Sequence, residues 1–174
     1  MGRTNHSKNE RGFTLIELLV VLAVIGLLSS VILGSLTTAR TKSRDARRIS
    51  DLRQVEKALQ IYLDKNGSYP STSGAWRGTC TSYGSYPRTG AGAYIPNLAP
   101  TYIPILPVDP APIGADGCYV YNSNGTDFMF MAHTTVETFD PDEFPNVGNP
   151  PHPLDRQNFN QQSISVFSPG ARLW

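Results

Sequence analysis

The chain has 174 residues, of which 40% are hydrophobic and 17% charged, and a formal net charge of +1. This length leaves room for one membrane helix and one small soluble domain, and it excludes two full-sized domains. The charges are unevenly spread, since residues 40–57 hold seven basic and three acidic side chains, whereas residues 89–155 hold eight acidic ones and no Lys or Arg. Two solvated faces of opposite charge would explain this pattern, and so would head-to-tail contacts between identical subunits.

The first twelve residues, "MGRTNHSKNERG", are polar and basic, and we interpret residues 1–12 as a leader peptide on the cytoplasmic side that is cleaved. A secretory signal peptide has an apolar core of about 7 to 15 residues, and the run that follows here is longer. The sequence "LTTA" before Arg40 is a weak candidate for conventional cleavage, so ordinary secretion stays open as an alternative.

An apolar run follows the leader, and Glu17 is the only charged residue between Phe13 and Ala39. As a helix, its first 24 or so residues would rise roughly 36 Å, which is enough to cross a bilayer. We therefore predict a transmembrane helix over 13–39. An acidic side chain near the centre of such a helix costs roughly 2.5–3.5 kcal/mol, and less toward an end, so Glu17 should have a compensating partner.

Residues 40–67 continue as an amphipathic helix, because this stretch has no proline and its only glycine, Gly67, comes at the end. Apolar residues at three- and four-residue spacing form one stripe: Ile49, Leu52, Val55, Leu59, Tyr62 and Leu63. Two charged pairs decorate the polar side: Arg47 with Asp51, and Arg53 with Glu56. We predict a single helix from Phe13 to Lys65, with Ile61 pointing away from the stripe.

Residues 68–174 read as a loop-rich antiparallel β region. Eight prolines between residues 70 and 112 disfavour long helices or central strands there. "GCYVYNSNGTDFMFMAHTT" predicts a hairpin with strands at 118–121 and 128–135 around an Asn-Gly turn, and a further strand is expected at 163–168. A small sheet packed on the helical stripe gives an α+β fold.

The chain has two cysteines, Cys80 and Cys118. An even number in an exported domain suggests a disulfide, which would stabilise the domain by roughly 3 to 4 kcal/mol in the chain-entropy model. Two buried free thiols, or one thiol on a mobile loop, are the alternatives. With His133 and His152 these cysteines lack the close ligand pairs of a zinc site, and the sequence predicts neither zinc nor a catalytic triad.

The stretch "RGFTLIELLVVLAVIGLLSSVI" resembles the processing signal and first helix of type IV pilins and of the pseudopilins of type II secretion systems. "RRISDLRQVEKALQIYLDKNGSYP", "LPVDP" and "GCYVYNSNGTDFMF" are similar to later parts of major pseudopilins and related pilins. The resemblance covers residues 11–70 well, 105–133 less sharply, and the rest hardly at all. It implies a type IV pilin fold, with a long N-terminal helix packed against a small antiparallel sheet.

The resemblance also implies that a prepilin peptidase cuts between Gly12 and Phe13 and methylates the new amine of Phe13. Gly12 suits an extended, unobstructed scissile bond. Glu17 would then be the fifth residue of the mature chain, and it could pair with the Phe13 amine of a neighbouring subunit, or its own, once helices pack in a fibre. A boundary carboxylate that reaches lipid headgroups is the alternative.

The implied role is a structural, non-enzymatic fibre subunit that starts in the bacterial inner membrane with its C-terminal domain outside and ends in an extracytoplasmic fibre. Basic residues alone would predict the opposite orientation, because five lie at 40–48 against three in the leader. The implied partners are other copies of the chain, other pilins, the prepilin peptidase, an assembly platform with its ATPase, and membrane lipid before assembly.

Three further expectations follow. The chain could serve a pilus or, alternatively, a type II secretion pseudopilus that works as a piston. A different class is a membrane-anchored protein that binds DNA or carbohydrate through its aromatic-rich loops. The sequence predicts no cofactor. The resemblance to major pseudopilins raises the hypothesis that an acidic group binds calcium, and a solvated acidic loop is the alternative. This group consists of Asp140, Asp142 and Glu143.

Overall fold

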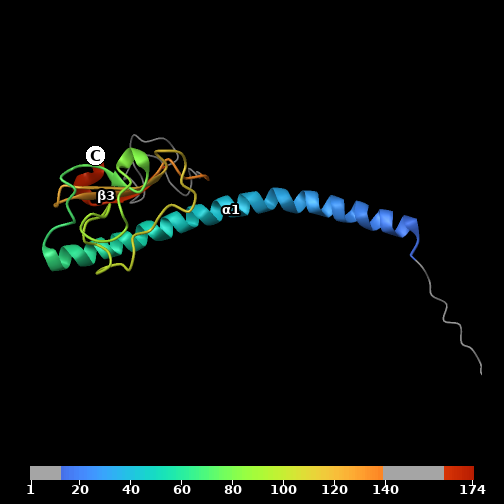
Figure 1. Cartoon of the computed structure of the whole chain (residues 1–174), viewed down its shortest axis with the longest axis horizontal. Helices are drawn as coiled ribbons and strands as arrows, with labels where there is room; N and C mark the ends of the chain where they lie inside the picture. The colour runs from blue at the N-terminus through green and yellow to red at the C-terminus, as the bar shows by residue number, and fades with distance from the viewer. Residues whose placement is uncertain (1–12, 139–162) are drawn as a thin grey trace, which may run out of the picture. The chain divides into compact units, whose positions relative to one another are not determined.

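The computed structural model describes residues 13–138 and 163–174, apart from the side chains of residues 31–35 and 172–173. The chain divides into two compact units, Met1–Arg40 and Thr41–Trp174. One helix, α1 (Leu15–Asn66), runs through both, as the sequence predicts (Figure 1). The leader, residues 1–12, and the acidic stretch 139–162 lie outside the described residues.

Within the described residues, no helix combines the length and the hydropathy needed to cross a membrane. The predicted span over 13–39 includes residues 31–35, whose side chains are not described. The transmembrane segment therefore stays a prediction.

A four-stranded antiparallel sheet lies against the second part of α1. Its order is β1 (Arg77–Gly78), β2 (Cys118–Ser123), β3 (Phe128–His133) and β4 (Ile164–Phe167). The predicted hairpin and final strand are confirmed, whereas β1 was missed because two residues are too short to show a strand pattern. Two short 3₁₀-helices, η1 (Thr81–Tyr83) and η2 (Pro169–Leu173), complete the fold. The predicted α+β class is confirmed.

The turn of the hairpin depends on a glycine. Ser123 pairs with Phe128 as the last pair of the β2–β3 ladder, which leaves residues 124–127 to reverse the chain. Gly125 has φ +96°, in the left-handed region that favours glycine, and Asn124 Oδ1 accepts the amides of Thr126 and Asp127 at 2.9 and 2.8 Å. The predicted Asn-Gly turn is therefore correct.

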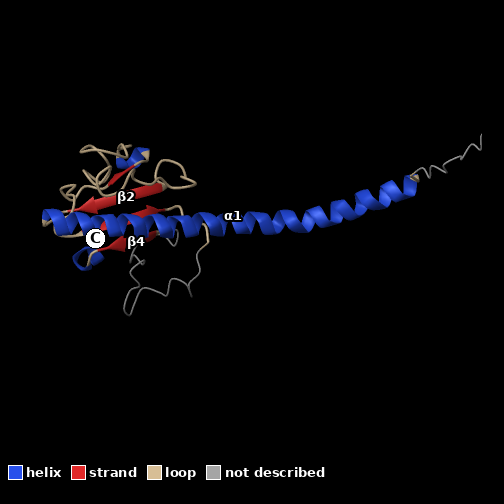
Figure 2. Cartoon of the chain, turned by 90° about the horizontal axis from the view of Figure 1, so that it is seen from below, coloured by secondary structure: helices blue, strands red, loops and turns tan. Residues whose placement is uncertain are grey.

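The second part of α1 lies along one face of this sheet (Figure 2), and its apolar stripe belongs to the same core cluster as that face. Leu52, Val55 and Leu59 are fully buried, while Ile61 is 48% exposed. Alternate residues of β2 and β3 meet this stripe, and the side chains between them point to the opposite face. The helix-facing residues are Tyr119, Tyr121, Phe128 and Phe130, and those of the opposite face are Cys118, Val120, Met129 and Met131. The sheet is thus buried on both faces.

The proline-rich loop contributes to the core as well as to the surface. Tyr94, Ile95, Leu98 and Leu106 are fully buried in the same cluster as the helical stripe. Tyr94 also donates its hydroxyl to the carbonyl of Pro107 at 2.8 Å. Apolar side chains spaced along an irregular backbone thus fill part of the core without any periodic pattern.

Candidate functional site

The resemblance singles out Phe13, which lies just before α1, and Glu17, which lies in its first turn. Phe13 is 86% exposed. The carboxylate of Glu17 accepts the backbone N–H of Thr14 at 3.0 Å and the Thr14 hydroxyl at 2.8 Å, and the Glu17 amide donates to Thr14 Oγ1 at 3.3 Å. These reciprocal bonds form a capping box, which satisfies donors that a helix N-terminus leaves free.

Sequence reasoning singled out Glu17 but missed Thr14. The signal was present, because Thr-x-x-Glu before an apolar run is the spacing of a capping box. The bonds to Thr14 show that Glu17 has a partner within its own chain. Gly12 lies outside the described residues, so the cleavage point, the methylation of Phe13 and the pairing of Glu17 with an amine remain predictions.

The N-terminal part of α1 exposes apolar side chains all round. From Phe13 to Leu28, the large apolar side chains are between 48% and 86% exposed. Soluble monomers rarely expose a contiguous apolar surface of this extent, which marks contact with other proteins or with lipid. Among the described residues, no other element covers this apolar surface. The exposed surface is the strongest indication that this region takes part in assembly.

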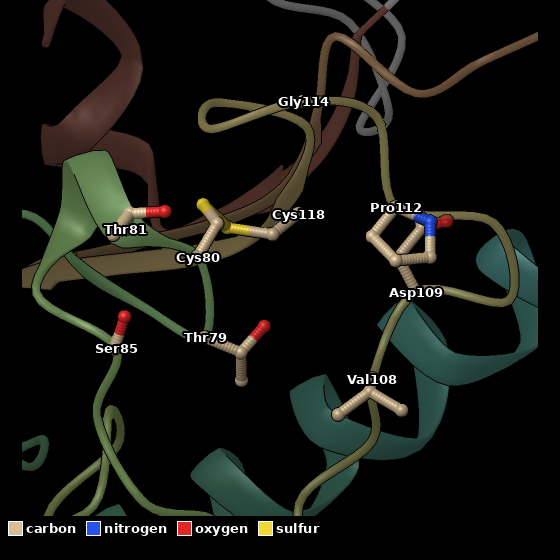
Figure 3. Close-up of a pocket in the computed structure, with 9 residues that line it drawn as sticks. All are labelled: Thr79, Cys80, Thr81, Ser85, Val108, Asp109, Pro112, Gly114 and Cys118. Carbon is tan, nitrogen blue, oxygen red and sulfur yellow. A yellow bond between two sulfur atoms is a disulfide. The ribbon is translucent and has the colours of Figure 1, made fainter.

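Cys80 and Cys118 are joined in a disulfide that links the start of η1 to the start of β2. A cavity of about 370 Å³ lies beside it, lined in part by the hydroxyls of Thr79, Thr81 and Ser85 (Figure 3). The carboxylate of Asp109 forms another part of its lining. Among the described residues that line this cavity, no buried polar side-chain atom lacks a hydrogen-bond partner, and Asp109 is bound to Arg48.

His133 has structural contacts on β3. Its Nε2 lies 3.4 Å from the Tyr83 hydroxyl, and its Nδ1 lies 3.2 Å from the carbonyl oxygen of Asp116. Among the described residues, no group of three or more His, Cys, Asp or Glu side chains is arranged to hold a metal. The calcium hypothesis falls on Asp140, Asp142 and Glu143, and it lies outside the described residues together with His152.

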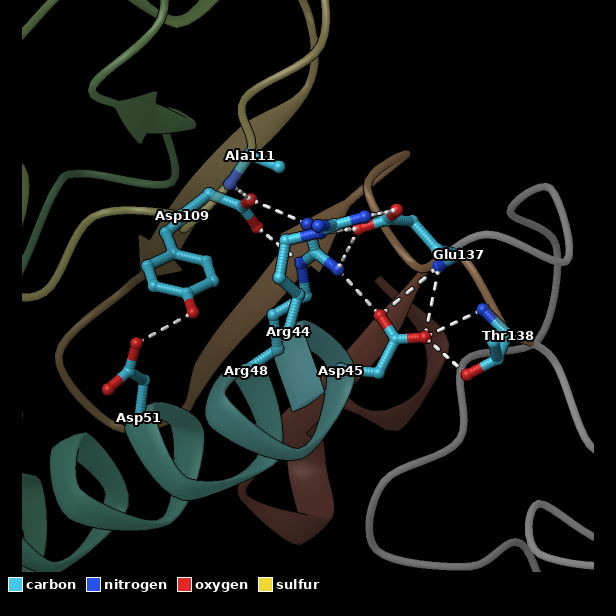
Figure 4. Close-up of polar contacts among 9 residues, drawn as sticks. Arg44, Asp45, Arg48, Asp51, Asp109, Ala111, Glu137 and Thr138 are labelled. Carbon is cyan, nitrogen blue, oxygen red and sulfur yellow. Dashed lines mark hydrogen bonds and ion pairs between the residues drawn. The ribbon is translucent and has the colours of Figure 1, made fainter. Parts of the chain in front are cut away.

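A buried ion network that sequence reasoning missed surrounds Arg48, whose side chain is fully buried in the domain (Figure 4). Its guanidinium makes a two-pronged contact with Asp109, from Nε and Nη2, both at 2.8 Å. Nη1 donates to Asp45 at 2.6 Å and to Glu137 at 3.1 Å. We call Arg44, Asp45, Arg48, Asp109 and Glu137 the Arg48 network.

Asp45 carries the second half of this network. Its carboxylate accepts the backbone amides of Glu137 and Thr138, the latter at 2.6 Å, and the Thr138 hydroxyl at 2.6 Å. Arg44 completes the network with a two-pronged contact to Glu137. Two cations thus balance two of the three carboxylates, and backbone amides stabilise the remaining charge.

Hydrogen bonds and charges shift the pKa values of the network. The hydrogen bond from the Arg44 guanidinium, and to a smaller extent that from Arg48, lowers the pKa of Glu137 to about 2. Burial alone would lower the pKa of Arg48, but its bonds to Asp109, Asp45 and Glu137 outweigh burial and raise it above the ordinary value. Both pKa shifts favour the charged forms, so Glu137 and Arg48 are charged at neutral pH.

The network corrects the interpretation of the charge asymmetry at two residues, Arg44 and Arg48. Sequence reasoning placed the basic residues after the apolar run on a solvated face or in contacts between subunits, yet Arg44 and Arg48 bind carboxylates of the same chain. One signal was available, because Arg48 falls four residues before Leu52, on the line of the buried stripe. Its partners were beyond reach, since Asp109 and Glu137 are 61 and 89 positions away.

Comparisons with known proteins point to the N-terminal region first. A family model described as the prokaryotic N-terminal methylation motif matches residues 7–33. The type II secretion system core protein G of Klebsiella michiganensis is 32% identical over 103 residues, which are 59% of this chain and 69% of that protein. No solved structure matches the chain.

Two other relatives match over shorter stretches. The type II secretion system core protein G of Pectobacterium carotovorum is 38% identical over 63 residues, 36% of this chain and 40% of that protein. The type IV wide pilus major component PilA4 of Thermus thermophilus is 38% identical over 68 residues, 39% of this chain and 52% of that protein. The chain thus spans about half the length of these two relatives.

Proposed function

Because the chain belongs to the family of type IV pilins and type II secretion pseudopilins, we propose that it is a structural subunit of a type IV pilus or a pilus-like fibre. The observation that carries the proposal is the first part of α1, which exposes apolar side chains from Phe13 to Leu28 and carries a single carboxylate, Glu17. Helices of this kind are stable only in lipid or against one another. The subunit catalyses no reaction.

Processing and assembly follow from the same region. A prepilin peptidase cleaves between Gly12 and Phe13 and methylates the Phe13 amine. Before assembly the chain is held in the bacterial inner membrane by its N-terminal helix, with the domain from Thr41 on outside. An assembly platform with its ATPase then moves subunits into the fibre, alongside other pilins.

Glu17 favours each addition of a subunit through its charge. In apolar surroundings its carboxylate is costly, and the capping bonds from Thr14 compensate only part of that cost. A neighbouring amine at Phe13 supplies the opposite charge once two helices lie side by side. Pairing of this kind is available only in the assembled state, so it drives assembly in one register.

The first experiment is the intact mass and N-terminal sequence of the protein recovered from its native cell envelope. A chain that begins at N-methylated Phe13 supports the proposal and makes fibre imaging the next step. A chain that still carries Met1 indicates a simple membrane anchor, and one that begins near Arg40 indicates an ordinary secreted domain. Either of the last two results overturns the proposal.

A specific observation favours the secretion pseudopilus as the second candidate. The match that covers 69% of a relative is to a type II secretion core protein G, and it extends over 103 residues rather than the N-terminal helix alone. Deletion of the gene separates the two functions. Loss of surface fibres or twitching indicates a pilus, whereas loss of protein export with surface fibres intact indicates a secretion pseudopilus.

A further inference from the structure

The Arg48 network connects three parts of the domain that are distant in sequence: α1, the loop 107–111 and the segment 134–138. We propose that Arg48 and Asp45 form an ionic latch that fastens this loop and this segment to α1, and that without Arg48 both would detach from the helix while the β2–β3 ladder stays folded. The latch is a property of the folded domain itself and does not depend on the fibre proposal.

The contacts of the segment change character at one residue. Val136 is 4% exposed and is the last residue of the segment in the hydrophobic core. Beyond it, the hydrogen bonds and ion pairs that Glu137 and Thr138 make within the described residues go to three side chains of α1: Arg44, Asp45 and Arg48. Apolar packing therefore holds the segment only as far as Val136, and the latch holds it afterwards.

Arg48 is the centre of the latch because its charge allows two carboxylates to lie buried close together. The side chain of Asp109 is fully buried and that of Asp45 is 9% exposed. Without the guanidinium these carboxylates would repel each other and lack compensation for lost hydration. Asp45 would then turn toward water and release the amides of Glu137 and Thr138.

The loop is held by the same centre. Asp109 uses both carboxylate oxygens on Arg48, and its Oδ1 also accepts the amide of Ala111 at 2.8 Å. Because Asp109 lines the cavity beside the disulfide, the latch also fixes one wall of that cavity. The amide of Ala111 therefore reports on the attachment of the loop, and the amides of Glu137 and Thr138 report on the attachment of the segment.

Hydrogen exchange of the full chain in detergent micelles tests the proposal, by comparison of Arg48→Met with the matched control Arg47→Met. Arg47 is the neighbouring arginine and its side chain is 62% exposed. Among the described residues its ion pair is a 3.9 Å contact between Nε and Asp51 Oδ2. We expect Arg48→Met to reduce the protection of the three reporter amides by at least about 100-fold, because it leaves buried carboxylates unpaired. Amides of the β2–β3 ladder should keep their protection, and Arg47→Met should match the wild type.

Two results would overturn the latch. One is unchanged protection of Glu137 and Thr138 in Arg48→Met, and the other is an equal loss across the β2–β3 ladder, which would make Arg48 a support of the whole fold. Should Arg48→Met fail to fold, Thr138→Val decides the question. It removes one donor to Asp45, and we expect a loss of about 2- to 10-fold at the Glu137 amide. No loss there would contradict the proposal.

Discussion

At Glu17, charge and hydrogen bonding are two separable properties of one side chain. The carboxylate accepts two bonds from Thr14 in the isolated chain, and a glutamine could accept them equally well because Gln also serves in capping boxes. The charge is needed only for the amine that we propose as its partner in the fibre. A substitution that keeps one property and removes the other can therefore separate helix initiation from assembly.

We expect Glu17→Gln to leave cleavage and helix content unchanged but to reduce the yield of fibre by at least about tenfold, because the ion pair with the Phe13 amine is lost. The yield is measured in the fraction sheared from cells. Glu56→Gln is the control, since Glu56 makes a surface pair with Arg53 at 3.0 Å on the same helix. Normal fibre yield in Glu17→Gln would remove the charge-pairing role.

Glu137 predicts a pH dependence. Its pKa is about 2 in the folded chain, because of Arg44, against an ordinary value of 4.5. A depressed carboxyl pKa stabilises the folded state fully above the unfolded value, and this stability is lost as pH falls through the window from about 4.5 to about 2. The melting temperature of the wild type should exceed that of Glu137→Gln at neutral pH.

The difference in melting temperature between the wild type and Glu137→Gln should narrow as the pH falls from about 4.5 to about 2, and it should disappear below that range. Thermal unfolding of both proteins by circular dichroism at several pH values measures this difference. Glu56→Gln is the control, because it alters a surface pair with Arg53. Asp127→Asn is unsuitable, because Asp127 accepts hydrogen bonds from Ser168 and Gly170. A difference in melting temperature that stays constant with pH would show that the charge of Glu137 does not contribute to stability.

At the scale of elements, the two parts of α1 differ in where their apolar side chains lie. Its first part exposes its apolar side chains, while its second part packs Leu52, Val55 and Leu59 against the sheet. Substitutions in the two parts should therefore have different consequences. Changes in the second part should reduce the stability of the domain, and changes in the first should affect assembly.

Leu59→Ala should lower the free energy of unfolding by about 2 to 5 kcal/mol, because it opens a cavity in the fully buried stripe. Ile61→Ala, two residues along the same helix, should lower it by less than about 1 kcal/mol, since this side chain is 48% exposed. Urea unfolding of the full chain in detergent measures both. Equal losses would contradict the packing of α1 on the sheet.

The elements that sequence reasoning recovered are those with a periodic signal. The helical stripe, the β2–β3 hairpin with its Asn-Gly turn and the final strand all follow from spacing and turn chemistry. Strand β1 has only two residues, and its pairing of Arg77 with Tyr121 is set by the fold rather than by its own pattern. Ile95 and Leu98, two core residues of the proline-rich loop, likewise have no periodic spacing that would indicate their burial.

For the candidate site, local signals were again the ones that could be read. Glu17 stands out because it is a lone charge in an apolar run, and Thr14 could have been found from its spacing. Arg48 is different, since its burial depends on Asp109 and Glu137, which approach it only after the domain has folded. A single sequence contains no record of such long-range pairing.

At the scale of the whole molecule, the disulfide connects the loop-rich half of the domain to the sheet. Replacing Cys80 and Cys118 by serine should lower the free energy of unfolding by about 4 kcal/mol, because a loop with a sequence separation of 38 gains freedom in the unfolded chain. Unfolding by guanidinium with and without reductant measures this loss. A variant as stable as the oxidised wild type would contradict it.

The two-sided burial of the sheet has a consequence for how correctly folded chains could be recognised. Along β2, Cys118 and Val120 point away from α1 while Tyr119 and Tyr121 point toward it, so a slip of one residue in the pairing would exchange the two sets. Such a slip would turn the Cys118 thiol to the wrong side of the sheet and away from Cys80. A misaligned chain would therefore keep two reactive thiols, and a simple thiol titration would count misfolded molecules in a population.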